Sequence, residues 1–205
     1  MSTVILANGR FPSHSIPLGM LNNASRIVCC DGSVENLESI GIKPTAIVGD
    51  LDSVPENLKL KYADRIFFNP DQNTNDLTKA ILWCKERDYK SITILAGTGK
   101  RDDHTIGNIG LLPSYAQLGV EVKMVTDFGT FIPLLTSTKL ESFAGQQVSI
   151  FSFTNATRLT THNLKYPIEG TTLPEPWMGT LNQSLGDYFE LEFEPGPLVV
   201  FATHQ

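Results

Sequence analysis

The stretch Ala46-Ile47-Val48-Gly49-Asp50-Leu51-Asp52-Ser53 carries the pattern on which the fold depends: a short apolar run that ends in an acidic loop. Such a run is typical of a buried strand. Gly49 lets the backbone approach a ligand closely, and the carboxylates of Asp50 and Asp52, at positions i and i+2, can point at one ion. The alternative is a solvated turn whose aspartates only cap local backbone groups.

The same pattern recurs on both sides of this stretch. Apolar runs that alternate with helical patterns predict an α/β domain with a mainly parallel, Rossmann-like sheet. The expected strands are Val4–Ala7, Ile27–Cys30, Ala46–Val48, Ile66–Phe68, Ile92–Ala96 and Val120–Val125.

Helices are predicted between these strands. Ser33 can cap a helix that ends before Gly41, and a later helix is expected from about Thr105 to Leu118 with a kink at Pro113. The apolar positions expected on buried helix faces are Val34, Leu37 and Ile40 in the first helix, and Leu77, Ala80, Ile81 and Cys84 in a second.

The last third of the chain has a different pattern. Val148–Phe153, Tyr188–Glu194 and Leu198–Phe201 resemble strands, and turns rich in proline and glycine separate them. We therefore expect an α/β domain over residues 1–130 and an all-β domain over residues 131–205.

Composition limits the partners and the compartment. The chain has 205 residues, 22 acidic and 16 basic side chains, and 41% hydrophobic residues, which excludes a disordered or collagen-like protein. Without a Lys/Arg block, nucleic acid and membrane are not expected as partners. The three cysteines, including the adjacent Cys29 and Cys30, predict reduced thiols, and the absence of a leader or of a long apolar run predicts a cytoplasmic protein.

Acidic residues follow four of the predicted strands. Ligands of open α/β sheets bind beyond the carboxyl ends of the strands, so these residues are candidates for a site. Gathered carboxylates repel one another unless a hard cation lies among them, and Mg²⁺ shared with substrate phosphates is the expected ion. The segments are Cys30-Asp31-Gly32, Gly49–Ser53, Asn69–Asp76 and Gly97–His104.

Cations lie within one of these segments and shortly after another. Asp76 and Lys79, three residues apart on a helix, can both face the sheet edge, although a surface ion pair is the alternative. The segment Gly97–His104 offers Gly99, Lys100 and Arg101 to anionic oxygens, and it is not a Walker A loop because Arg101 follows Lys100. His104 and Asn108 share a helix face and are candidates for substrate binding, with helix capping as the alternative for His104.

Taken in order, these motifs resemble those of the thiamine pyrophosphokinase family, which transfers a diphosphate from ATP to thiamine. Three positions depart from the family pattern, since Ser33 and Lys100 each stand where a second glycine is usual and Asn75 replaces a threonine. The similar segments are Asp31-Gly32-Ser33, Gly49–Ser53, Asn75–Lys79 and Gly99–His104.

The resemblance implies an α/β catalytic domain, a C-terminal β-sandwich domain that binds thiamine, a homodimer and the use of Mg-ATP. It implies that Asp31, Asp50, Asp52 and Asp76 hold Mg²⁺ and that Lys79 or Arg101 neutralises charge. Asp76 or Asp103 is expected to accept the proton of the thiamine hydroxyl. The positions expected at ATP are Asp31, Gly49, Gly99, Lys100, His104 and Asn108.

The thiamine contacts are expected in the all-β domain. Thr180 and Asn182 are similar to a short family segment near the thiamine pocket, with Leu181 in place of a serine. Trp177 can offer an aromatic face to the cationic thiazolium, or it can be a packing residue. Two other functions stay open: a nucleotide-sugar transferase that uses the D-x-D pair, and a nucleotide or thiamine sensor without turnover.

Overall fold

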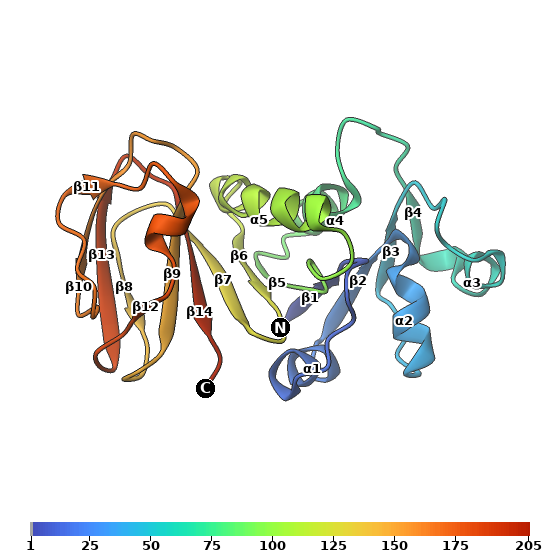
Figure 1. Ribbon diagram of the computed structural model, residues 1–205. Helices are drawn as coiled ribbons and strands as arrows, with labels where there is room; N and C mark the ends of the chain where they lie inside the picture. Colours follow the sequence, from blue (N-terminus) through green and yellow to red (C-terminus); the bar gives the residue numbers. More distant parts are fainter. Residues whose placement is uncertain (1) are drawn as a thin grey trace. The chain divides into compact units, whose positions relative to one another are not determined.

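The computed structural model describes residues 2–205, which form two compact units (Figure 1). The first contains the residues up to Asn108 together with Gly119–Asp127, and the second contains Ile109–Leu118 and Phe128–Gln205. Helix α5 (Asp102–Gln117) therefore contributes its first residues to one unit and its remaining residues to the other.

The first unit contains a parallel sheet with the strand order β6-β5-β1-β2-β3-β4. Every residue of β1 and β3 is buried, as is usual for parallel strands that helices cover on both faces. These strands confirm the six runs predicted from the sequence. They are β1 Thr3–Leu6, β2 Arg26–Cys30, β3 Ala46–Gly49, β4 Ile66–Phe68, β5 Ser91–Leu95 and β6 Glu121–Val125.

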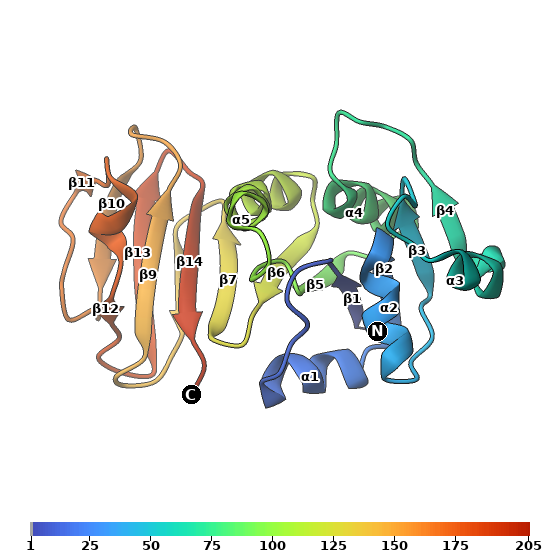
Figure 2. The ribbon, with the colours of Figure 1, turned by 45° about the vertical axis from the view of Figure 1, so that its right-hand side comes forward.

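Helices lie on both faces of this sheet, with α1 and α4 on opposite sides (Figures 1 and 2). The order of the strands reverses at β1 and β5, because β2 to β4 extend from one side of this pair and β6 extends from the other. A sheet of this kind binds ligands beside such a reversal, at the carboxyl ends of the strands. The helical segments are α1 Ser15–Asn22, η1 Asp31–Ser33, α2 Val34–Ser39, α3 Glu56–Lys61, η2 Ala63–Arg65 and α4 Asp76–Glu86.

The predicted helix α4 is confirmed in detail, and its four expected apolar positions are buried. The predicted cap of α2 is wrong. Ser33 has αR backbone angles and its hydroxyl donates a 2.7 Å hydrogen bond to the carbonyl of Leu6 instead. Ile40 is also not a core residue, because α2 ends at Ser39 and the Ile40 side chain is 44% exposed.

The second unit is all-β apart from its part of α5 and a 3₁₀ turn. Its strands pair antiparallel in two groups, β12-β9-β14-β7 and β11-β10-β13-β8. Buried side chains from both groups, such as Val148, Leu191 and Val200, form one hydrophobic cluster. The segments are β7 Gly129–Leu134, β8 Thr138–Glu141, β9 Gln147–Ser152, β10 Arg158–His162, β11 Thr171–Thr172, η3 Pro176–Gly179, β12 Asn182–Gln183, β13 Tyr188–Glu194 and β14 Leu198–Thr203.

The pairing shows where the prediction of a mainly parallel sheet holds. Among residues 2–205, parallel pairs join strands of the first unit, whereas β7, β9, β12 and β14 pair antiparallel. In the same part of the chain, no helix is long and apolar enough to cross a bilayer. The three cysteines are buried and unpaired, as predicted.

Candidate active site

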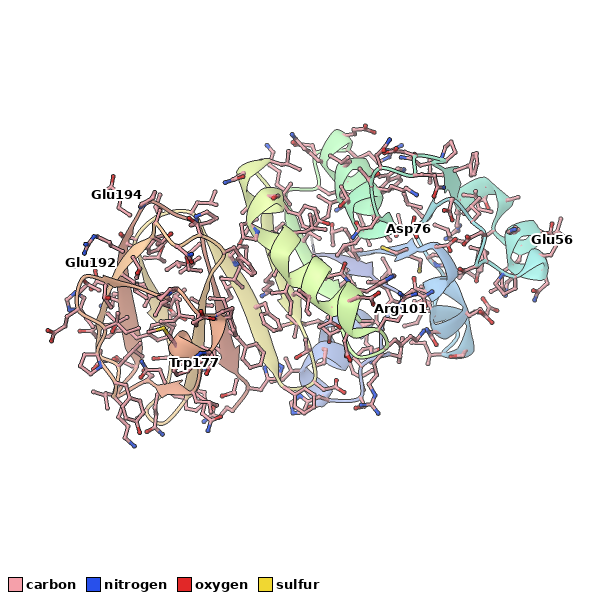
Figure 3. All side chains as sticks on the ribbon, turned by 45° about the horizontal axis from the view of Figure 1, so that its top comes forward. Glu56, Asp76, Arg101, Trp177, Glu192 and Glu194 are labelled. Carbon is pink, nitrogen blue, oxygen red and sulfur yellow. The ribbon has the colours of Figure 1, made fainter. Side chains whose placement is uncertain are left out.

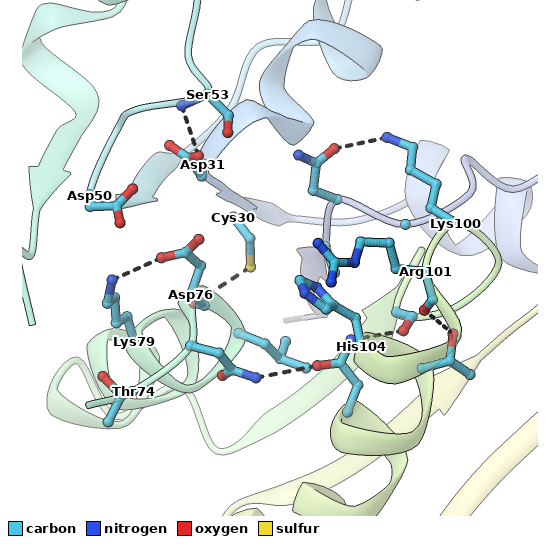
Figure 4. Close-up of a pocket in the computed structure, with 18 of the residues that line it drawn as sticks. Cys30, Asp31, Asp50, Ser53, Thr74, Asp76, Lys79, Lys100, Arg101 and His104 are labelled. Carbon is cyan, nitrogen blue, oxygen red and sulfur yellow. Dashed lines mark hydrogen bonds and ion pairs between the residues drawn. The ribbon is translucent and has the colours of Figure 1, made fainter. Parts of the chain in front are cut away.

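A cavity of about 480 Å³ lies at the carboxyl ends of the parallel strands, within the first unit (Figure 4). Its walls come from the loops after β1, β3 and β5, from η1, and from the first turns of α4 and α5. Pockets for small ligands are commonly this large. Of the predicted site residues, those that line it are Asp31, Asp50, Asp52, Asp76, Lys79, Lys100, Arg101, His104 and Asn108.

Three carboxylates converge in this cavity. Asp31 begins η1, Asp50 follows β3 and Asp76 is the first residue of α4, and one carboxylate oxygen of each lies within 4.8 Å of the others. The strand order explains the convergence, because β2 and β3 are neighbours and α4 packs against both. Three oxygens at this spacing form a ligand set of the kind that a hard divalent cation prefers.

Asp31 is the most deeply buried of the three, with 4% of its surface exposed. Its Oδ2 accepts a 3.2 Å hydrogen bond from the backbone N–H of Ser53, but its Oδ1 is buried without a partner. Burial raises the pKa of Asp31, and the nearby charges of Asp76 and Asp52 raise it further. A bound cation would satisfy the Oδ1 atom and offset this repulsion.

Gly49 makes the convergence possible. A Cβ at this position would lie 3.1 Å from Cβ of Asp31 and 3.3 Å from Oδ1 of Asp76. A larger residue would therefore push the two carboxylates apart. This is the close approach that the sequence predicted for Gly49, although it serves neighbouring side chains and Gly49 itself does not line the cavity.

Asp50 and Asp52 differ in their surroundings. Burial opposes ionisation of Asp50, but hydrogen bonds from the Asp52 N–H and the Gln72 amide, both 3.4 Å, outweigh it and lower the Asp50 pKa. Asp52 lies outside the group of three, and its Oδ1 accepts a 3.0 Å hydrogen bond from the Ser53 hydroxyl. The predicted i, i+2 pair thus supplies one carboxylate to the group and one to the cavity wall.

Lys79 lies inside the site. Its side chain is 2% exposed, and its Nζ lies 3.0 Å from Oδ1 of Asp76. The alternative of a surface ion pair is therefore wrong. Behind this pair, the thiol of Cys30 contacts the carbonyl oxygen of Asp76 at 3.7 Å, and burial raises the Cys30 pKa well above its usual value.

An amide bridge joins the two helices that border the cavity. Asn75 accepts a 2.9 Å hydrogen bond from the Thr78 N–H as the cap of α4, and its Nδ2 donates to Oδ1 of Asn108 at 3.4 Å. Nδ2 of Asn108 donates to the carbonyl of Gly97 at 2.8 Å. The Asn108 amide, predicted as an ATP contact, therefore holds the backbone of the loop after β5.

The loop after β5 supplies the other cations. Arg101 pairs with Asp103 through two hydrogen bonds, of which the one from Nε is 3.1 Å, and this pairing lowers the Asp103 pKa to about 2. Gly99 has a φ of 89°, which favours glycine, and like Asp103 it does not line the cavity. Lys100 extends across to Asn8, whose Oδ1 lies 3.0 Å from its Nζ.

The sequence interpretation missed the loop after β1. Ala7, Asn8 and Gly9 line the cavity, but this strand end carries no acidic residue and was not singled out. The available signal was Asn8-Gly9 directly after an apolar run. Gln72 and Thr74 of the loop before α4 also line the cavity and were missed as individual residues.

The residues predicted at thiamine belong to the second unit. Trp177, marked in Figure 3, is 70% exposed in η3, and the Thr180 hydroxyl donates to its carbonyl at 2.7 Å. Asn182 is buried, and its amide both donates to and accepts from the backbone of Tyr166. Trp177 thus offers an exposed ring, whereas Asn182 fixes a neighbouring segment.

Comparison with known families gives two adjacent matches. Residues 18–124 match the model described as thiamin pyrophosphokinase, catalytic domain, and residues 129–201 match thiamin pyrophosphokinase, substrate-binding domain. Thiamin pyrophosphokinase 1 of Caenorhabditis elegans is 32% identical over 100 residues, 44% of this chain and 41% of that protein. Thiamine pyrophosphokinase of Bacillus subtilis is 27% identical over 132 residues, 61% of each chain. These alignments span less than two thirds of either relative.

Solved structures with the same fold cover the chain more fully. Thiamine pyrophosphokinase from Bacillus subtilis superposes with a TM-score of 0.84 at 21% identity over 100% of both chains. The enzyme from Candida albicans superposes with the same TM-score at 18% identity, over 100% of this chain and 89% of that one. With the two family matches together extending from residue 18 to residue 201, the chain belongs to the thiamin pyrophosphokinase family.

Proposed function

We propose that this protein transfers a diphosphate group from ATP to the hydroxyl of thiamine, giving thiamine diphosphate and AMP. Membership of the family supports the reaction class. The observation that carries the proposal is the group of Asp31, Asp50 and Asp76, with Lys79 beside it, inside one cavity at the reversal of strand order.

The resident cation is proposed to be Mg²⁺. Asp31, Asp50 and Asp76 would hold it, and Asp52 would complete its surroundings from the cavity wall. The unpartnered Oδ1 of Asp31 and the all-oxygen donor set fit this ion. When bound, Mg²⁺ supplies neutralisation of phosphate charge, which is the main requirement of phosphoryl-type transfer.

The protein's own groups have separable tasks in this proposal. Lys79 holds Asp76 in place and adds a positive charge where negative charge develops. Arg101 can supply a second positive charge once it leaves Asp103. Of the two candidate bases, Asp76 is better placed for the thiamine hydroxyl, because it lines the cavity, whereas Asp103 does not line it and is paired with Arg101.

The second unit is proposed to bind thiamine. The exposed ring of Trp177 can cover the thiazolium, with Thr180 and Asn182 shaping the segment that follows it. We also propose the functional division into residues 1–130 and 131–205, a Rossmann-like sheet in the first and a β-sandwich in the second. A cytoplasmic homodimer, without a nucleic-acid or membrane partner, completes the proposal.

Release of AMP from Mg-ATP tests this function. We expect AMP only when thiamine is present, its loss after addition of EDTA, and a fall of at least about 100-fold in the Asp50→Asn and Asp76→Asn variants. Asp64→Asn, which removes a 78% exposed aspartate side chain from η2, is the matched control and should keep full activity. Nucleotide binding without AMP release would favour a sensor. Transfer from a sugar nucleotide, without any release of AMP from ATP, would favour a glycosyltransferase.

A further inference from the structure

The cavity has two chemically different sides. Asp31, Asp50, Asp76 and Lys79 gather on one side, and Lys100 lies on the other with the loop after β5 (Figure 4). If the carboxylates hold a metal ion with part of a linear polyphosphate, a phosphate further along the polyphosphate would lie toward the loops after β1 and β5.

Lys100 differs from the other cations that line the cavity. Lys79 lies 3.0 Å from a carboxylate oxygen of Asp76, and Arg101 is paired with Asp103. Within the described chain, Lys100 has no carboxylate within 4.0 Å, and its Nζ donates instead to the neutral amide oxygen of Asn8. Its positive charge is therefore uncompensated, and two of its three N–H groups are free for an anion.

The backbone holds Asn8 in place for this contact. The N–H of Gly9 donates to the carbonyl of Ala96 at 2.7 Å, and the N–H of Arg10 donates to the carbonyl of Thr98 at 2.7 Å. A Cβ at Gly9 would lie 2.3 Å from both of these carbonyl oxygens, so the two loops approach as closely as a glycine allows. Asn8 thus holds the Lys100 side chain at the wall of the cavity, beside the carboxyl ends of β1 and β5.

We propose that Lys100, oriented by Asn8, binds the phosphate that leaves with AMP. This inference rests on the proposed function. In the transfer, the thiamine oxygen forms a bond to the β-phosphorus as the bond from this phosphorus to the bridging oxygen breaks. The electron pair stays on that oxygen, which departs with AMP, and the hydroxyl proton passes to a carboxylate. Lys100 stabilises the charge that accumulates on the leaving phosphate.

Binding of AMP without metal tests this subsite separately from turnover. Calorimetry with AMP should show an affinity at least about 10-fold weaker in Lys100→Gln than in the wild type, the loss expected for a charged hydrogen bond. Asn8→Ala, which removes only the orienting group, should weaken AMP binding by about threefold. Lys90→Gln, on an exposed lysine paired with Asp88, is the matched control and should bind AMP as the wild type does.

Binding of magnesium diphosphate locates the effect within the cavity. Lys100→Gln should bind it within about twofold of the wild type, because the carboxylate side is unchanged. Three outcomes would overturn the subsite. The wild type and Lys100→Gln could bind AMP with equal affinity, or the wild type could fail to bind AMP. The third is that Lys100→Gln loses as much affinity for magnesium diphosphate as for AMP.

The steady-state reaction separates this inference from the proposed function. Lys100→Gln should lower kcat and weaken product inhibition by AMP, with the KM for thiamine unchanged. If the wild type makes thiamine diphosphate and AMP inhibits Lys100→Gln as strongly as the wild type, the subsite alone is refuted. A wild type that binds AMP through Lys100 yet never transfers diphosphate would refute the proposed function alone.

Discussion

The ammonium group of Lys79 is buried against Asp76, with Nζ 3.0 Å from Oδ1, in the first turn of α4. Asp76 is one of the three aspartates that gather in the cavity. A lysine with 2% of its side chain exposed is costly to bury unless a charge compensates it. Here the compensation is mutual, because Lys79 also reduces the repulsion among the carboxylates. This ion pair therefore links the stability of the site to its chemistry.

Lys79→Met is expected to lower AMP formation by at least about 100-fold and to reduce the free energy of unfolding by about 2 kcal/mol. Saturating Mg²⁺ should restore part of the stability, by neutralising the carboxylates, but not the activity. Thermal unfolding and AMP release measure the two effects. Lys59→Met breaks the i, i+3 pair with Glu56 on α3, which is more exposed, and should cost less than about 0.5 kcal/mol.

Gly9→Ala is expected to destabilise the protein by about 1–3 kcal/mol and to weaken nucleotide binding, because its Cβ would collide with two backbone carbonyls that cannot move independently. Gly107→Ala in α5 is the control, since a Cβ there meets nothing within 4 Å. The control should be neutral or more stable by up to about 1 kcal/mol. Chemical denaturation measures the free energy of unfolding of both variants. A Gly107→Ala variant less stable than Gly9→Ala would contradict this account.

The Asn75–Asn108 bridge can be separated from the cap of α4. Asn75→Ser keeps an oxygen for the Thr78 N–H but is too short to reach Asn108, so it should raise the KM for ATP by about threefold to tenfold at nearly unchanged stability. Asn75→Ala loses both contacts and should also cost about 1 kcal/mol of stability. Equal kinetics in Asn75→Ser and wild type would show that the bridge does not position the loop.

A pH-dependent contribution to stability is expected from Asp127. Burial disfavours its charge, but hydrogen bonds from the N–H of His14 (3.0 Å) and from the N–H and hydroxyl of Ser13 outweigh burial and lower the Asp127 pKa. Because the folded-state pKa lies below the ordinary value of 3.8, the stabilisation is complete above that value and is lost as the pH falls through the folded-state pKa.

Asp127→Ala should therefore cost about 2 kcal/mol at pH 7 and progressively less below pH 4, as measured by urea denaturation across this range. Asp187→Ala, at a bend directly before β13 in the second unit, serves as a control for loss of a single carboxylate. A difference between wild type and Asp127→Ala that stayed constant down to pH 2 would mean that the charge of Asp127 contributes nothing.

The strands of the first unit were predictable because buried parallel strands are largely continuous apolar runs, as in Val4–Leu6 and Ala46–Val48. The strands β7, β8, β10, β11 and β12 were not predicted, and two of them show a physical reason. Pro133 interrupts the pattern of β7, and β10 buries Leu159 and Thr161 on a strand that is otherwise polar. Cross-strand neighbours, which a sequence does not display, stabilise such strands.

The site was predictable where it consists of charged residues. Asp31, Asp50, Asp76 and Lys79 were all identified from acidic strand ends and helix spacing, and the structure brings them into one cavity. Asn8 was missed, because a neutral residue becomes part of a site only through its distant neighbour, Lys100. The sequence likewise could not show that Asn108 is engaged with Gly97 and Asn75.

The protonated thiol of Cys30, beneath Asp76, has a consequence for metal selection. Thiophilic ions such as Zn²⁺ and Cd²⁺ bind thiolates, and a cysteine beside three carboxylates would ordinarily attract them. Burial raises the Cys30 pKa well above its usual value, which makes the sulfur a poor target for oxidants and alkylating agents. A thiophilic ion would have to displace the Cys30 proton before it could bind the sulfur, whereas a hard cation finds three carboxylate oxygens already gathered, and this difference favours an oxygen-binding ion in the cavity.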